Sequence, residues 1–225
     1  MPGAYFDESD LAVVAAAADL VVPGAAAAGV ADYIDTLLGA FTFDPPRLFA
    51  GGPTSGRHGG AATFGNWLAP NSVQELAWRI RIEGTASRPE REFNGEHRGW
   101  QDEYRAGLAA LGADFLDVDT DERERRLDAD PGFKALLYQH GCEGMYGDPV
   151  YGGNRDYAGW DAIGYAGDIQ PRGYTPEEVS GREKSPIERE VTVVTGAIAP
   201  VTTQHSELEM ESETESEEGR GVDGG

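Results

Sequence analysis

The sequence predicts a mostly α-helical single domain with long loops that are rich in glycine and aromatic residues. Apolar residues recur at helical spacing in successive segments, and residues that cap helices precede several of those segments. The strongly β-branched stretch lies near the C-terminus. With 225 residues, 40% of them hydrophobic, the chain is long enough to bury one core. We expect a helical domain over residues 1–185, a short β or extended arm over 186–205, and a disordered acidic tail over 206–225.

The first two helices are predicted to form a hairpin. Asp7 or Ser9 can cap the first helix, and Pro23-Gly24 stops it. Its apolar stripe is Leu11, Val14, Ala15, Ala18 and Val22. The stripe of the second helix is Val30, Tyr33, Ile34, Leu37, Leu38 and Phe41. We expect the two stripes to bury a shared seam.

A glycine- and proline-punctuated loop over residues 44–70 separates this hairpin from further helices. Ser72-Val73-Gln74-Glu75 fits a capping box that starts the next helix. Helices are then expected over 96–112 and 120–128, and a further one starts at Asp130-Pro131, an N-cap followed by proline. The stripe of that last helix is Phe133, Leu136, Leu137, His140 and Met145.

Residues 141–175 carry few helical signals and many glycine and aromatic residues. Asp148-Pro149 favours a turn, and Gly152-Gly153-Asn154 can reach positive φ and admit a close backbone approach. Tyr151 and Trp160 are of the residue types that anchor interfaces, with Arg155 as a charged partner. A compact loop packed on its own domain is the alternative. After this region, Thr175-Pro176 predicts one more short helix.

The net charge of −22 argues against nonspecific nucleic-acid binding and against binding to an anionic membrane surface, because phosphates would be repelled. Of the 18 basic residues only Lys134 and Lys184 are lysines. Such a composition suits a halophilic protein, and a GC-rich genome that writes arginine for lysine explains it equally well. No transmembrane span and no export signal are visible, so we expect a cytoplasmic protein, or one exported with a signal-bearing partner.

The chemistry-bearing residues are few. Cys142 is the only cysteine, so it either contacts or bridges to a partner chain, or it is a small buried residue at a helix end. His140 lies two residues away, a spacing that points the two side chains apart on a helix. Asp148 and Asp156 either help to hold a calcium ion or cap their own loop, and the EF-hand spacing is absent.

The pattern EGMYGDPVYGGNRDYAGWDAIGYAGD, starting at Glu143, resembles the signature of the gluconate 2-dehydrogenase subunit 3 family. Residues 19–25 and 29–35 resemble the first motif of that family, and the resemblance covers roughly 7–175. It implies a noncatalytic small subunit. In such complexes a large subunit of the glucose–methanol–choline (GMC) type holds the FAD and oxidises a sugar or alcohol, and a haem c subunit often takes the electrons. Family members commonly carry a twin-arginine export signal, which this sequence lacks.

We therefore expect an accessory subunit that binds and stabilises a FAD-dependent GMC-type dehydrogenase and aids flavin incorporation or assembly. There is no GxGxxG after a strand, no CxxCH haem site and no P-loop, so we expect no catalytic, cofactor or metal residues in this chain. The candidate partner-interface residues are Cys142, Tyr146, Asp148, Pro149, Tyr151, Gly152, Gly153, Asn154, Arg155 and Trp160. The alternatives are a stand-alone hydrolase or isomerase using acids near the glycine-rich loop, and a structural module that adds residues 187–203 to another sheet.

Overall fold

The computed structural model describes residues 3–51, 66–165 and 167, and the predicted helical class is confirmed there. The arm over 186–205, the tail over 206–225 and the helix expected at Thr175 lie outside the described residues, so they stay predictions. The α-helices are α1 (Glu8–Val21), α2 (Val30–Leu38), α3 (Ser72–Glu83), α4 (Trp100–Leu111), α5 (Thr120–Asp128), α6 (Pro131–Tyr146) and α7 (Ala158–Ala162). Two two-residue strands, β1 (Ala50–Gly51) and β2 (Asn66–Trp67), pair antiparallel within the predicted loop.

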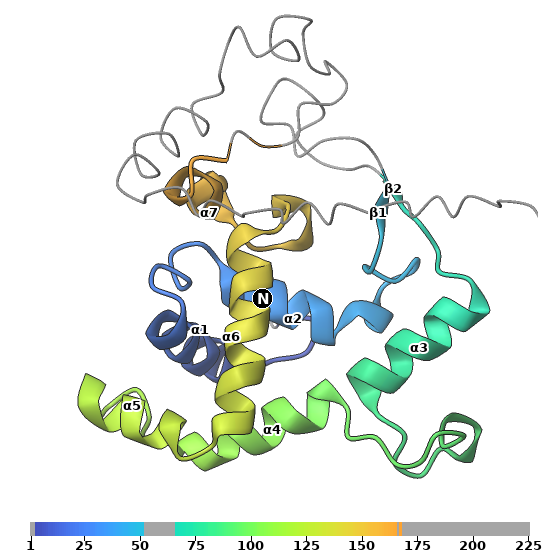
Figure 1. Ribbon diagram of the computed structural model, residues 1–225, viewed down its shortest axis with the longest axis horizontal. Helices are drawn as coiled ribbons and strands as arrows, with labels where there is room; N and C mark the ends of the chain where they lie inside the picture. The colour runs from blue at the N-terminus through green and yellow to red at the C-terminus, as the bar shows by residue number, and fades with distance from the viewer. Residues whose placement is uncertain (1–2, 52–65, 166, 168–225) are drawn as a thin grey trace, which may run out of the picture.

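Helix α6 is the centre of the arrangement (Figure 1). It packs against α1, α2, α4, α5 and α7, and it crosses in front of α2 in this view. The core that these helices share includes the fully buried Val14, Ile34, Tyr104, Phe115 and Leu137. The predicted hairpin of α1 and α2 is confirmed, and its shared seam continues onto α6.

Helix starts follow the capping residues, with one correction. Asp7, Asp119 and Asp130 each accept a backbone hydrogen bond at the start of a helix, and Pro131 stands at the first helical position. The capping box of α3 is wrong by one residue, because Asn71, not Ser72, is the cap. Its side chain accepts from the Val73 and Gln74 amides, and the Gln74 side chain accepts from the Asn71 amide.

Other boundaries also differ from the expectation. The helix expected over 96–112 is α4, which begins at Trp100 and ends at Leu111. Helix α2 ends at Leu38, and Phe41 lies in a short 3-10 turn, Ala40–Thr42. Helix α6 continues through Tyr146, so the first four residues of the glycine-rich pattern form its last turn. Helical packing of Gly144 and Met145 against neighbouring residues outweighs the weak helix propensity of the glycines there.

The N-terminal segment is fastened to α2 by a buried carboxylate. Asp35, 6% exposed, accepts hydrogen bonds from the backbone amides of Ala4, Tyr5 and Phe6. Three amide donors compensate a buried charge that has no described basic partner. Asp35 therefore holds the N-terminal segment on α2, with Phe6 buried in the core.

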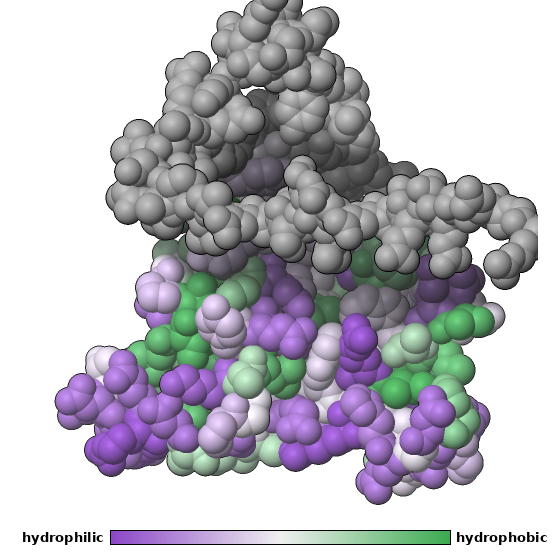
Figure 2. Space-filling view, in the orientation of Figure 1, coloured by the Kyte–Doolittle hydropathy of each residue, from purple (hydrophilic) through white to green (hydrophobic). Residues whose placement is uncertain are grey.

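The surface varies in character along the visible face (Figure 2). Hydrophilic residues cover the end formed by α5, where the sequence TDERERRLD is almost entirely charged. Hydrophobic residues are interspersed on both sides of α6. None of the helices in the described part of the chain is long and apolar enough to cross a membrane.

Candidate functional site

The two segments that resemble the family motifs lie far apart in the sequence and meet in the fold. The Tyr33 hydroxyl on α2 donates a 2.8 Å hydrogen bond to Glu143 Oε2 on α6. The Arg155 amide donates to the Ala28 carbonyl oxygen at 2.8 Å, and the Arg155 guanidinium pairs with Asp32. The glycine-rich segment is thus docked onto the start of α2.

The turn after α6 is tightly built around its glycines and one asparagine. Asn154 is fully buried; its Nδ2 donates to the Gly147 carbonyl oxygen, and its Oδ1 accepts from the Gly159 amide, both at 2.9 Å. A Cβ at Gly153 would lie 2.1 Å from the Gly144 carbonyl oxygen, and Gly152 has φ +106°. The close backbone approach predicted at Gly152-Gly153 therefore exists, and the described chain makes it with itself.

Asp148 caps its own turn by accepting a 2.9 Å hydrogen bond from the Val150 amide. This confirms the capping alternative for Asp148. In residues 3–51 and 66–165, no group of three His, Cys, Asp or Glu side chains is placed to hold a metal ion. The two strands there are two residues long, too short for a βαβ dinucleotide-binding unit.

Trp160 is already buried within this chain. Its side chain is 4% exposed, and its Nε1 donates a 2.8 Å hydrogen bond to the Tyr146 carbonyl oxygen. The rings of Tyr157 and Tyr165 pack against it, with centroids 5.7 and 5.1 Å away. A direct contact of Trp160 with a partner stays a prediction, and the contacts shown make it a support for the turn.

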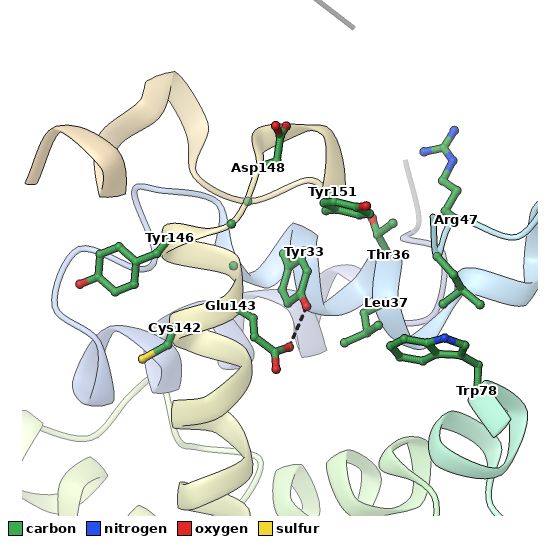
Figure 3. A pocket seen from close by; sticks show the side chains of 14 residues that line it. Tyr33, Thr36, Leu37, Arg47, Trp78, Cys142, Glu143, Tyr146, Asp148 and Tyr151 are labelled. Atoms are coloured by element: carbon green, nitrogen blue, oxygen red, sulfur yellow. Dashed lines mark hydrogen bonds between the residues drawn. The ribbon is translucent and has the colours of Figure 1, made fainter. Parts of the chain in front are cut away.

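A pocket of about 630 Å³ opens between α2, α3, the last turn of α6 and the turn that follows (Figure 3). Aromatic side chains of Tyr33, Trp78 and Tyr151 line it, and the Glu143 carboxylate stands among them. Half of the predicted interface residues also line it: Cys142, Tyr146, Asp148, Tyr151 and Gly153. The other half build the turn around it: Pro149, Gly152, Asn154, Arg155 and Trp160.

The electrostatics of the pocket centre on the pair of Tyr33 and Glu143. Burial, and secondly the neighbouring Glu143 carboxylate, raise the pKa of the Tyr33 hydroxyl well above its ordinary value. Tyr33 therefore remains a neutral hydrogen-bond donor, unsuited to act as a base near pH 7. Gln139 Nε2 donates to the second oxygen, Glu143 Oε1, at 3.0 Å.

The rim of the pocket joins the strand pair to the turn. Tyr151 Oη accepts a hydrogen bond from the Ala50 amide at 3.2 Å, and its ring meets the Trp67 ring edge-on at 5.6 Å. The Arg47 guanidinium lies 4.0 Å from the centroid of the Phe43 ring and points away from Glu143 in Figure 3. Arg47 thus contributes its aliphatic stem to the pocket.

His140 and Cys142 do not form a nucleophile–base pair. His140 is fully buried, and its Nδ1 forms a 3.0 Å hydrogen bond with the Tyr104 hydroxyl. Burial lowers the pKa of His140 to about 4. Cys142 is partly exposed and contributes to the lining of the pocket, with its side chain directed away from Tyr33 and Glu143 (Figure 3). The thiol is therefore accessible to a partner chain, as one of the two alternatives for it requires.

Three of the pocket side chains, Tyr33, Trp78 and Glu143, were not among the predicted site residues. Tyr33 was expected only in a helix stripe, and Glu143 only as the first residue of the pattern. Tyr33 belongs to the N-terminal motif and Glu143 to the glycine-rich one. Asking where two family-like motifs meet would have identified this pair, whereas nothing local marks Trp78.

Comparisons with known proteins agree with the motifs. A family model described as gluconate 2-dehydrogenase subunit 3 matches residues 8–167. No curated protein and no solved structure matches the chain. The match spans α1 to α7 and includes both segments that meet at the pocket. The chain belongs to the gluconate 2-dehydrogenase subunit 3 family.

Proposed function

We propose that this chain is a noncatalytic accessory subunit that binds and stabilises a FAD-dependent GMC-type sugar or alcohol dehydrogenase. The family description supports a role as a dehydrogenase subunit. The observation that carries the proposal is the convergence of both motif segments on one pocket, through the Tyr33–Glu143 hydrogen bond and the Arg155–Asp32 ion pair. Residues far apart in sequence are thereby placed on one surface.

The surface around the pocket has the character of a protein interface. Tyr146 is 39% exposed at the end of α6, while Ile163 and Tyr165, beyond α7, are 53% and 41% exposed. Of these residues Tyr146 lines the pocket, and a partly exposed aromatic side chain at a pocket is typical of a binding site for another protein. Tyr146 and Tyr151 are the aromatic contacts we propose, and Cys142 is the thiol beside them.

The flavin in this proposal belongs to the large subunit, where the oxidation takes place. Binding of the small subunit favours the folded, flavin-loaded form of its partner by mass action, which is how it would aid flavin incorporation. A haem c subunit would act as the electron acceptor of the assembled complex. The present chain supplies a rigid docking surface.

The pocket also indicates which acidic residues the enzymatic alternative would use. Glu143 and Asp148 both line it, so a stand-alone hydrolase or isomerase would use this carboxylate pair. Such an enzyme would turn over a sugar or ester without any other subunit.

Affinity capture of the tagged chain from its native host, followed by flavin absorbance and mass spectrometry, tests the proposal. A flavoprotein recovered near one-to-one supports the accessory role. A colourless chain recovered alone contradicts it. Turnover by that isolated chain, lost in Glu143→Gln, would establish the hydrolase or isomerase instead.

A further inference from the structure

We propose that the pocket is a socket for one arginine or lysine side chain of the large subunit, and that Glu143 is the carboxylate that receives it. This inference rests on the proposed function and adds to it the chemistry of the partner group. Three features carry it: a carboxylate without a described cation, aromatic walls that suit a cationic side chain, and a strongly negative chain.

The Glu143 carboxylate is fixed in position by neutral donors. Tyr33 Oη donates to Oε2 at 2.8 Å, and Gln139 Nε2 donates to Oε1 at 3.0 Å. A carboxylate has about four lone-pair sites, so each oxygen can accept a further hydrogen bond. Among the described residues, no basic group lies within 4 Å of Glu143 to supply it.

Neighbouring acids differ from Glu143 in this respect. Asp32, one position before Tyr33, is paired with Arg155. Glu83 on α3 receives three arginines, Arg79, Arg88 and Arg91. Asp32 and Glu83 are thus ion-paired within the described residues, whereas Glu143 holds only neutral donors and can still receive a cation.

The residues that line the pocket can contact both the methylene groups and the charged end of a cationic side chain. Tyr33, Trp78 and Tyr151 present aromatic rings, to which a guanidinium or ammonium group is attracted, and Leu37 adds apolar surface for the methylene stem. Arg47, the basic residue at the rim, has its guanidinium over Phe43 and directed away from Glu143.

The volume of the pocket and the negative net charge of the chain favour a side chain that belongs to another protein. A volume of about 630 Å³ accepts a long side chain together with the residues that flank it. The net charge of −22 attracts a basic partner surface and accelerates its association.

The test measures the affinity of the full-length chain for the flavoprotein large subunit of its host by biolayer interferometry at two salt concentrations. Glu143→Gln keeps the shape of the side chain and removes the charge. Its amide oxygen can accept from Gln139, and its NH2 group can donate to the Tyr33 hydroxyl, which is able to accept as well as donate. We expect this variant to bind about tenfold more weakly at the lower salt concentration, and to show a smaller salt dependence than the wild type. Glu124→Gln on α5 is the matched control, because it removes one exposed charge far from the pocket.

The outcomes separate this inference from the proposed function. If the wild-type chain does not bind the large subunit, both are wrong. If it binds and Glu143→Gln behaves like Glu124→Gln, the socket is wrong and the accessory role stands. A double-mutant cycle between Glu143 and each basic residue on the large subunit identifies the cation. We expect one residue to show at least about fivefold coupling, and coupling to none would overturn the proposal.

Discussion

Two faces of α6 use the same helix for different purposes. Towards the core it presents Phe133, Leu137 and His140, which are at most 3% exposed. Towards the pocket it presents Glu143, and Cys142 and Tyr146 also contribute to the lining. His140 and Glu143 are three positions apart, yet His140 is held neutral by burial, whereas Glu143 is exposed on the pocket wall. Residue type alone therefore does not determine the role of a side chain on α6. The packing around the face that carries it determines that role.

Substitutions on or against the core face should lower the stability of the subunit, and substitutions on the pocket face should lower its affinity for the partner.

The largest effect is expected where α7 packs on the end of α6. A Cβ at Gly159 would lie 1.8 Å from the Met145 carbonyl oxygen, so Gly159→Ala must separate the two helices or distort the turn between them. We expect the free energy of unfolding to fall by about 3 kcal/mol, measured by urea denaturation.

The matched control for Gly159→Ala is Gly132→Ala in the first turn of α6. The nearest atom to a Cβ there is Asp130 Oδ1 at 3.5 Å, an ordinary contact. We expect Gly132→Ala to leave the stability unchanged or to raise it slightly, because alanine favours the helix. Equal destabilisation by the two alanines would show that the contact of α7 with α6 is not tight.

The second prediction concerns the pH dependence that buried His140 confers. The pKa of His140 is lowered to about 4 by burial, against an opposing effect of the Glu143 carboxylate. The unfolded chain binds a proton at this histidine near its ordinary pKa of about 6.5, whereas the folded chain binds it only near 4. This contribution to stability is therefore present above about pH 6.5, is lost as the pH falls, and amounts to on the order of 3 kcal/mol.

His140→Gln removes that titration and is the direct test. Chemical denaturation at pH 7.5, 6 and 5 should show the wild type losing its advantage over the variant as the pH falls. A constant difference between the two proteins at all three pH values would mean that His140 is protonated as easily in the folded chain as in the unfolded one.

Sequence reasoning predicted those features that local rules determine. Asp7, one of two candidates, and Asp130 were predicted as caps and are confirmed, because a capping side chain acts on amides two or three residues away. Asn71 was missed in favour of Ser72, since both residue types cap helices and the sequence offers both in succession.

The pocket could not be predicted from local rules. Tyr33 and Glu143 are 110 positions apart, and their meeting depends on how α2 and α6 cross. The glycine-rich pattern did locate half of the lining, because its residues are contiguous in sequence. The same pattern gave no indication that Asn154 and Trp160 face inward, as burial of a polar or aromatic side chain depends on what packs over it.

The third prediction tests the pocket face with two tyrosines of α6. Tyr146 lines the pocket and is 39% exposed, whereas Tyr138, two turns earlier, is 55% exposed and outside the pocket. We expect Tyr146→Ala to weaken binding to the large subunit about tenfold, as for an aromatic interface residue, and Tyr138→Ala to have little effect. Calorimetric titration of each variant with the large subunit measures this. Equal losses would place the interface along α6 as a whole, and no loss in either would remove it from this helix.

The smallest effect on stability is expected for the Arg155–Asp32 ion pair, in which the side chains are 56% and 52% exposed. An exposed pair of this kind contributes no more than about 0.5 kcal/mol, and Arg155→Ala keeps the backbone bond from residue 155 to Ala28. Thermal unfolding of Arg155→Ala and Asp32→Asn should therefore show nearly unchanged midpoints.

The affinity for the large subunit distinguishes the two variants. If Arg155 serves the partner, Arg155→Ala weakens binding several-fold, while Asp32→Asn leaves the arginine available and binding intact. Equal weakening by both would instead mean that the pair acts only by holding the turn on α2, which would extend the structural role of the core face into the motif loop.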